Sequence, residues 1–337
     1  MLNQVKNSDL KLNYRSNSNL NVENPISFLD YLEGFISNAS TKRVKGYGTV
    51  GLAFNTIRAY KSLVKVIREF ESYSRTKLYL HNIYKVTADQ LTQFLSYKCY
   101  SDNYCGQQLK LIKIILKDAH KSGYEIHPYS VFIETFKQKT SERIIHILTL
   151  DEIQQVKALK NITSQLVNSY KWFLIGLSIG QRISDLLSLQ PYQIGRSSSG
   201  LYIDIVQQKT KKAVTVGVVD PMVIDLLLNQ FPQKVSLVEF NKCIKHICRL
   251  AGINEEVQGF KINPKTRRKE FMRAPKYKFM TSHIMRRSFA SNYYRKIETL
   301  LMNIIGHSKE STFLAYIGTN QNKDALADLF MEKVRAI

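Results

Sequence analysis

IIGHSKESTFLAYIG, residues 304–318, is the most specific segment of this chain. An apolar run ends at a glycine, His307 follows directly, and Tyr316 comes nine residues after the histidine. Ser311 or Thr312 is placed to cap a short helix that carries the tyrosine. The segment therefore places an imidazole and a hydroxyl nucleophile close together. Among 19 tyrosines a packed core ring is the default interpretation, and it is the surrounding pattern that distinguishes Tyr316.

Cationic side chains precede this segment. Arg182 lies in GQRISDLLSL, just after a glycine helix stop, where its planar guanidinium can bind two phosphate oxygens at once. His283 and Arg286 are three residues apart at the start of a predicted helix, so their side chains share one face. Thr281 or Ser282 would cap that helix, and its N-terminus adds partial positive charge where a phosphate would dock.

Lys209 lies in a QKT turn between the β-rich runs LYIDIVQQ and AVTVGVV, which predict a hairpin. A lysine on a turn can give a proton to a leaving oxygen. Lys211 and Lys212 are close competitors, and all three could simply contact backbone phosphate. Asp185 follows Arg182 by three residues and could orient its guanidinium or a neighbouring imidazole, with an ordinary surface ion pair as the alternative.

The order, contexts and spacing of these residues resemble the tyrosine recombinase (phage integrase) family, including mobile-element integrases of Bacteroides type. The resemblance covers about residues 140–320 by motif and, more loosely, residues 22–125. It implies a mainly α fold with a small antiparallel β-sheet, in which a helical core-binding (SAM-like) domain precedes a tyrosine recombinase catalytic domain. It also implies six catalytic residues: Arg182, Lys209, His283, Arg286, His307 and Tyr316.

The resemblance implies an enzyme that cleaves and rejoins DNA through a 3′-phosphotyrosyl intermediate, without a metal ion, cofactor or nucleotide. Tyr316 would be the nucleophile, Lys209 would protonate the leaving 5′-oxygen, and His283 would assist proton transfer at the tyrosine. The two arginines and His307 would stabilise the transition state. Such a site-specific recombinase would integrate, excise or invert a mobile or phage element.

Two other functions are open. A type IB topoisomerase uses similar Arg, Lys, His and Tyr chemistry as a monomer, and a DNA-binding accessory protein could keep the fold with a decayed active site. The His-x-x-Arg and Gly-His…Tyr contexts favour the recombinase over the topoisomerase. All six catalytic positions are filled, which argues against a decayed site.

The charge balance points to a polyanionic partner. The 337 residues include 49 basic and 27 acidic residues, for a net charge of +22, which favours double-stranded DNA over a merely solvated lysine-rich surface. Candidate DNA contacts lie in a loop and helix of the N-terminal half, in the QKT and KTRRK turns, and beside the second arginine. These are Lys42, Arg43, Lys45, Arg58, Lys61, Lys65, Lys211, Lys212, Arg267, Arg268, Lys269 and Arg287.

Composition also divides the chain. Residues 1–21, rich in Asn, Ser and Lys, predict a flexible arm. Residues 22–135 contain four amphipathic helical segments and form the expected DNA-binding domain. A basic linker at 136–148 leads into the catalytic domain, residues 149–337, which opens on a capping box at Thr149.

Cysteine spacing and hydropathy argue against a zinc site, a membrane span and a secretory signal. Cys243, His246 and Cys248 form C-x-x-H-x-C, but without a second cluster a helix is favoured over a zinc site. No apolar run approaches the ~20 residues that cross a bilayer, and the N-terminus lacks a secretory signal. We therefore expect a cytoplasmic, nucleoid-associated protein that does not engage membranes.

The resemblance further implies a homotetramer on paired DNA sites, with host or element-encoded DNA-bending proteins as helper partners. Residues 322–337 carry an apolar stripe at helical spacing and would form a terminal helix. That helix would dock on a neighbouring subunit, or pack within its own domain.

Overall fold

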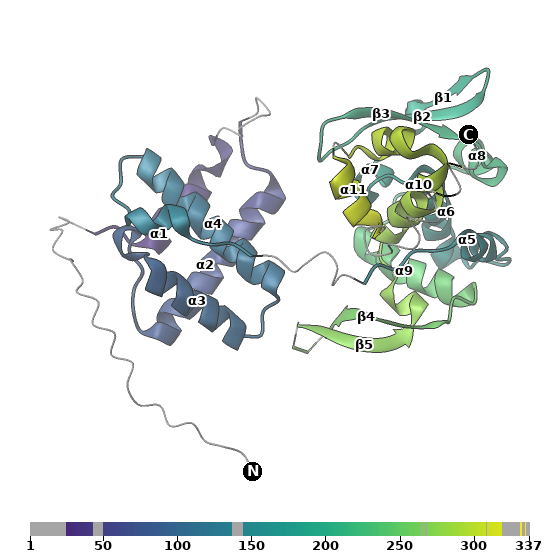
Figure 1. The fold of residues 1–337 in the computed structure, drawn as a ribbon. Helices are drawn as coiled ribbons and strands as arrows, with labels where there is room; N and C mark the ends of the chain where they lie inside the picture. Colours follow the sequence, from purple (N-terminus) through teal and green to yellow (C-terminus); the bar gives the residue numbers. More distant parts are fainter. Residues whose placement is uncertain are drawn as a thin grey trace, which may run out of the picture. The chain divides into compact units, whose positions relative to one another are not determined.

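The computed structural model describes residues 25–42, 50–136, 144–263, 265–266, 268–307 and 309–318, together with positions 331 and 334. Within these, the side chains at 295, 296, 298 and 299 are not described. The chain divides into two compact units, Met1–Lys137 and Gln138–Ile337 (Figure 1). The predicted arm at 1–21 and residues 137–143 of the predicted linker lie outside the described residues.

The described part of the first unit is helical. Its α-helices are α1 (Phe28–Ser37), α2 (Phe54–Ser74), α3 (Lys85–Tyr97) and α4 (Asp102–Lys121). Each helix buries one apolar stripe in a shared core, with Leu32, Leu63, Leu95 and Ile115 fully buried. The helices form because apolar side chains recur at the 3.6-residue period, so that packing against the neighbours stabilises each of them.

The second unit mixes helices and small sheets. Its helices are α5 (Leu150–Lys157), α6 (Ser164–Ile179), α7 (Ile183–Leu186), α8 (Pro221–Leu228), α9 (Leu237–Leu250), α10 (His283–Ile305) and α11 (Glu310–Ile317). Strands β1 (Ile194–Ser197), β2 (Gly200–Val206) and β3 (Ala213–Val218) form an antiparallel sheet in that order. Strands β4 (Glu256–Ile262) and β5 (Lys269–Pro275) form a separate hairpin. The predicted mainly α fold with small antiparallel sheets is confirmed.

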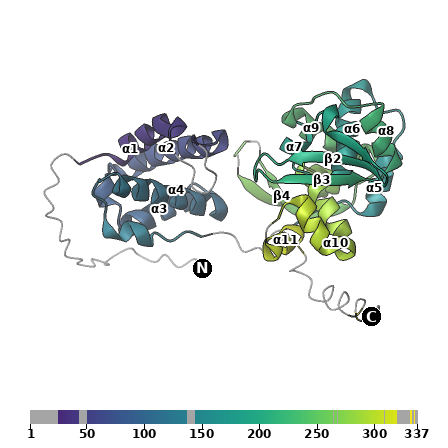
Figure 2. The ribbon, with the colours of Figure 1, turned by 90° about the horizontal axis from the view of Figure 1, so that it is seen from above.

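Helix α6 is the centre of this unit. It packs against α8, α9, α10 and β3, and Trp172, Phe173 and Ile175 are among its fully buried side chains. A Cβ at Gly176 would lie 2.2 Å from Met285 Sδ, so the glycine lets α10 approach α6 closely. Figure 2 shows α10 and α11 on the side of the unit where β3 lies. This packing brings the end of α6 next to the first turns of α10.

Local signals account for several boundaries. Thr149 and Glu152 form the predicted reciprocal capping box at the start of α5. Gly180 ends α6 with a φ of 62°, a left-handed conformation that favours glycine. The predicted capping box at Thr149 and helix end at Gly180 are therefore confirmed. Both were predictable because they depend only on residues that are neighbours in the sequence.

Three details differ from expectation. Strand β1 was not predicted. Ser282 is the residue before α10 but makes no side-chain capping bond, and its backbone is already helical (φ −54°, ψ −22°) rather than extended as in a usual N-cap. Helix α11 begins at Glu310 after Lys309, so Ser311 and Thr312 lie inside the helix and do not cap it.

Apart from positions 331 and 334, the predicted terminal helix at 322–337 lies outside the described residues. No helix in the described ranges is both long and apolar enough to cross a membrane.

Candidate active site

Arg182 is positioned by the end of the central helix. Since α6 stops at Gly180, the chain turns and Arg182 becomes the residue that precedes α7. Its Nη1 donates to the side-chain oxygen of Gln207 at 2.8 Å. Gln207 follows β2, so the hairpin and the α6–α7 turn together hold this guanidinium in a half-buried position.

Arg286 is the fourth residue of α10 and is only 2% exposed. Its Nη1 donates to the carbonyl of Gly180 at 3.2 Å, and its Nη2 donates to the carbonyl of Ile305. Burial and the neighbouring Arg182 lower the pKa of Arg286 to about 10. Two guanidinium groups held so close, one of them deeply buried, form a site that an anion would stabilise.

Tyr316, on α11, faces these cations. The guanidinium carbons of Arg286 and Arg287 lie 5.9 and 5.5 Å from the centre of its ring. Its hydroxyl is buried and makes no well-aligned hydrogen bond with any of the described residues. Burial raises the pKa of Tyr316, while the charges of Arg286, Arg287 and Arg182 lower it in part. Arg286 is close enough to act on the hydroxyl electrostatically without a well-aligned hydrogen bond.

Two histidines border the tyrosine and the arginines. The His307 ring lies 5.3 Å from the ring of Tyr316 and 5.5 Å from that of Phe313. Desolvation and the charges of Arg286, Arg182 and Lys209 lower the pKa of His307 to about 4. Desolvation and nearby cations also lower the pKa of His283. Both imidazoles are therefore neutral at pH 7, and each can donate or accept a single proton.

Lys209 lies in the turn between β2 and β3 and is exposed. Its charge contributes to the lowered pKa values of both His283 and His307, so it acts electrostatically on the same cluster. Lys211 and Lys212 are exposed on the same turn, and Lys212 Nζ donates to Asn303 Oδ1 at 3.5 Å. The described structure thus brings all six predicted catalytic side chains together in one place, called the Tyr316 site below.

Asp185 plays a different part from the one expected. Its carboxylate is buried, and Oδ1 accepts a bond from the backbone N–H of Gln208 at 3.0 Å. Within the described residues, no hydrogen bond or ion pair joins this carboxylate to the Arg182 guanidinium, which bonds to Gln207 instead. The expected orientation of the guanidinium by Asp185 is therefore not observed. Asp185 instead fixes the start of the turn that carries Lys209.

The predicted DNA contacts fall into four groups. Arg58, Lys61, Lys65, Lys211, Lys212 and Lys269 are exposed. Lys42 pairs with Asp118 at 2.7 Å and lies over the Phe35 ring, whereas Arg287 lies against Tyr316 rather than on an open face. Arg268 is half-buried at the β4–β5 turn. The remaining candidates, Arg43, Lys45 and Arg267, lie outside the described residues.

The cysteine and histidine pattern in α9 is helical, as expected. Cys243 and Cys248 are buried among apolar side chains, and burial raises the pKa of Cys248 to about 12. A thiol that is so hard to ionise is a poor metal ligand. The described ranges contain no group of three or more His, Cys, Asp or Glu residues arranged to hold a metal ion.

Sequence reasoning missed two buried glutamines. Gln181 and Gln207 are both fully buried, and Gln207 Nε2 donates to Gln181 Oε1 at 3.0 Å. Gln181 stands directly before Arg182 and Gln207 two residues before Lys209. This closeness to Arg182 and Lys209 was the only feature of the sequence that could have drawn attention to the two glutamines, and it does not indicate that their side chains are buried.

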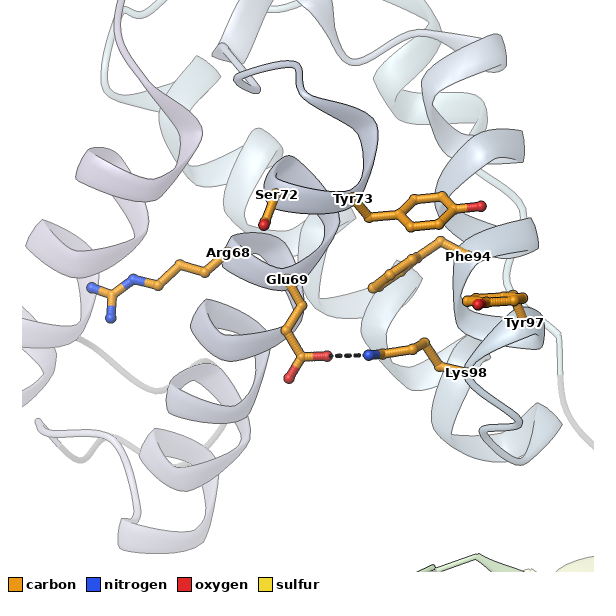
Figure 3. Close-up of a pocket in the computed structure, with 7 residues that line it drawn as sticks. All are labelled: Arg68, Glu69, Ser72, Tyr73, Phe94, Tyr97 and Lys98. Atoms are coloured by element: carbon orange, nitrogen blue, oxygen red, sulfur yellow. Dashed lines mark ion pairs between the residues drawn. The ribbon is translucent and has the colours of Figure 1, made fainter.

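A surface hollow of about 440 Å³ lies in the first unit, and none of the residues of the Tyr316 site lines it. Figure 3 shows its lining, with the exposed rings of Tyr73 and Tyr97 stacked 5.7 Å apart. Its lysine, Lys98, pairs with Glu69 at 3.4 Å, and Arg68 pairs with Glu33. With its cations already paired, this hollow does not offer the unpaired positive charge of the Tyr316 site.

No family model and no curated protein matches the sequence, but solved structures do. A lambda integrase dimer bound to a COC′ core site matches with a TM-score of 0.61 and 14% identity, covering 87% of this chain and 78% of that chain. The XerH site-specific recombinase in a post-cleavage complex matches at 0.59 and 16%, covering 89% and 93%. The Tn1549 transposon integrase with transposon right end DNA matches at 0.58 and 15%, covering 92% and 100%.

These matches extend over both units of the chain. At identities this low they establish the fold, which is that of the tyrosine recombinases. The resemblance read from Arg182, the His-x-x-Arg motif and the segment ending at Tyr316 is therefore confirmed at the level of the fold.

Proposed function

We propose that this protein is a site-specific DNA recombinase that cleaves and rejoins double-stranded DNA through a 3′-phosphotyrosyl intermediate at Tyr316. The observation that carries the proposal is the Tyr316 hydroxyl, which is buried, makes no well-aligned hydrogen bond within the described residues and lies beside Arg286 and Arg287. A buried nucleophile beside two guanidinium groups is suited to attack on a phosphodiester. The solved neighbours, bound to a COC′ core site, a palindromic difH substrate or transposon right end DNA, support DNA as the substrate class.

In the proposed reaction, Tyr316 Oη attacks the scissile phosphorus and the bond from phosphorus to the 5′-oxygen breaks. Neutral His283 accepts the phenolic proton, and Lys209 gives a proton to the departing 5′-oxygen. Rejoining reverses these transfers when a 5′-hydroxyl attacks the phosphotyrosine. The covalent link conserves the phosphodiester energy, so the cycle needs no nucleotide.

Arg182 and Arg286 stabilise the charge that develops on the non-bridging oxygens, because their guanidinium groups are held before substrate binds. His307 is neutral in the free protein and contributes as a hydrogen-bond donor. A bound phosphate would raise the pKa of His307 and strengthen this contact.

The same proposal extends to assembly. A lambda integrase tetramer on a Holliday junction matches this chain with a TM-score of 0.61 and 13% identity, covering 87% of this chain and 78% of that chain. We infer a homotetramer on two paired DNA sites, acting in integration, excision or inversion of a mobile element with DNA-bending helper proteins. The exposed lysines and arginine of α2 and the turn lysines would contact the DNA backbone.

A nicked suicide substrate that carries the recombination site tests the proposal. The protein should form a covalent DNA adduct, Tyr316→Phe should form none, and Tyr293→Phe on the exposed face of α10 should behave as the parent. An adduct that persists in Tyr316→Phe would overturn the choice of nucleophile. Relaxation of plasmid without strand exchange on two-site DNA would indicate a type IB topoisomerase, and DNA binding without an adduct an accessory protein.

A further inference from the structure

Gln207 makes four hydrogen bonds through one fully buried amide. Its Oε1 accepts from Arg182 Nη1 (2.8 Å) and from Thr210 Oγ1 (2.7 Å). Its Nε2 donates to Gln181 Oε1 (3.0 Å) and to the carbonyl of Ile305 (3.2 Å). The amide therefore joins the end of β2, the turn that carries Lys209, the α6–α7 turn and the end of α10.

The orientation of this amide is fixed by chemistry. A guanidinium can only donate and a carbonyl oxygen can only accept, so the oxygen of Gln207 must face Arg182 and its nitrogen must face Ile305. Gln181 is ordered in the same way, because its Nε2 donates to the carbonyl of Ile304 at 2.9 Å while its oxygen accepts from Gln207. Satisfied buried polar networks of this kind hold one geometry.

The network connects the two arginines. Arg286 Nη2 and Gln207 Nε2 both donate to the carbonyl of Ile305, and Gln207 Oε1 accepts from Arg182. The path from one guanidinium to the other thus runs through a single carbonyl and a single amide. Both linking groups are neutral, so neither cancels the charge of the arginines, as a carboxylate in the same place would.

We propose that Gln207 is a positioning residue that sets the distance between Arg182 and Arg286 while leaving both charges available to a phosphate oxyanion. The proposal deepens the function proposed above and rests on it for its catalytic consequence. The required chemistry is a neutral side chain that accepts from a guanidinium and donates to a carbonyl at once. Glutamine meets this requirement and glutamate, when ionised, does not.

Gly306 supports the same arrangement. A Cβ added there would lie 2.3 Å from Gln207 Oε1, in a residue whose φ is 75°. Gly306→Ala would therefore displace the amide without adding charge. Gly252 has a similar φ of 78°, and a Cβ there would meet nothing within 4 Å. Gly252→Ala therefore carries the same backbone strain without the collision.

The test compares Gln207→Glu with Gln208→Glu in the full chain. The neighbouring Gln208 is exposed, and its Nε2 bonds to Ser184 O and Ser188 Oγ, so the control makes the same charge change outside the network. Gln207→Glu should form the covalent DNA adduct on the order of 100-fold more slowly at saturating protein, the scale of a 1 Å misplacement. Its DNA affinity should match that of Gln208→Glu, which should cleave as the parent does.

A second readout does not need activity. Inorganic tungstate, a tetrahedral dianion, should raise the melting temperature of the parent and of Gln208→Glu, and should raise that of Gln207→Glu much less. Like Gln207→Glu, Gly306→Ala should form the covalent adduct more slowly and respond less to tungstate. Gly252→Ala should behave as the parent in both measurements.

The outcomes separate the two proposals. If the parent forms no adduct but only the Gln207 and Gly306 variants lose the tungstate response, the recombinase function fails and the positioning role stands. If Gln207→Glu cleaves and binds tungstate as Gln208→Glu does, the positioning role is overturned. It is also overturned if Gln207→Glu loses cleavage, DNA binding and melting temperature together, because Gln207 would then be only a structural residue.

Discussion

Arg182 is half-buried, and within the described residues its guanidinium makes one hydrogen bond, to Gln207 beside the hairpin, which leaves its other N–H groups for substrate. Arg182→Lys would keep the charge and remove the two-point grip on phosphate oxygens. We expect covalent adduct formation to fall by on the order of 100-fold or more, the scale of losing one transition-state donor, with little change in DNA affinity. Single-turnover cleavage and binding to the same duplex measure the two quantities.

The matched control is Arg196→Lys, the same change on the exposed strand β1. It should leave cleavage within about threefold of the parent, since exposed substitutions away from special contacts change little. If Arg182→Lys and Arg196→Lys cleave alike, Arg182 does not bind the transition state.

The lowered pKa of His307 predicts how the stability of the fold depends on pH. Its folded pKa, about 4, lies below the ordinary 6.5, so the unfolded chain binds the proton more readily between these values. The stability of the fold is therefore unaffected by this group above pH ~6.5 and decreases as the pH falls toward 4. In His307→Gln, the fall in melting temperature between pH 7 and pH 5 should be smaller than in the parent.

Because His307 is only half-buried, solvent screens part of this effect. We expect a difference of about 2–4 °C, the shift that ~1 kcal/mol produces in a unit of this size. His120→Gln, an exposed substitution at the end of α4, serves as the comparison. Melting curves of His307→Gln and His120→Gln that respond identically to pH would rule out the burial of a neutral His307.

At the scale of elements, two helix glycines give opposite expectations. A Cβ at Gly106 in α4 would lie 1.8 Å from the carbonyl oxygen of Phe136, whereas a Cβ at Gly34 in α1 would meet nothing within 4 Å. Gly106→Ala should push the segment around Phe136 off α4 and lower the free energy of unfolding by about 1–3 kcal/mol. Gly34→Ala should raise it by up to ~1 kcal/mol through helix propensity. Denaturant unfolding of both variants measures the difference, and equal shifts would contradict the close packing of Phe136 on α4.

Helices and hairpins were predictable wherever the signal is local. The apolar stripe of α2, the Thr149 capping box and the Gly180 helix stop depend on residues a few positions apart, and the structure has each of them. The segment around Tyr316 was recognised in the same way, from the residue types and spacing within residues 304–318. Local pattern is enough for these features because backbone hydrogen bonds and caps are made within one turn.

Features that depend on distant partners were not predictable. Asp185 binds the turn backbone because the hairpin folds over α7, and Gln207 is buried because the end of α10 meets β2. The neutral state of His307 follows from desolvation and from Arg286 and Arg182, which are far away in the sequence. Each of these depends on tertiary packing, which sequence spacing alone does not contain.

At the scale of the whole molecule, the net charge of +22 makes an electrostatic prediction. If DNA is the partner, the logarithm of the affinity should fall linearly with the logarithm of the salt concentration, by about 0.9 for each phosphate neutralised. Arg58, Lys61 and Lys65 are exposed on α2 and, within the described residues, none of them forms an ion pair. Replacing all three by glutamine should therefore weaken binding and flatten the salt dependence by about 0.9 for each phosphate that is no longer neutralised.

The comparison removes the same charge from the second unit, by replacing the exposed Lys160, Lys234 and Lys242 with glutamine. Both triple variants lower the net charge equally, so both weaken the long-range attraction that speeds association. Only the removal of direct phosphate contacts changes the number of counterions released, and with it the slope. Equal slopes in the two variants would mean that α2 acts through overall charge and does not touch the DNA backbone, whereas a flatter slope for the α2 variant alone identifies that face as part of the DNA-binding surface.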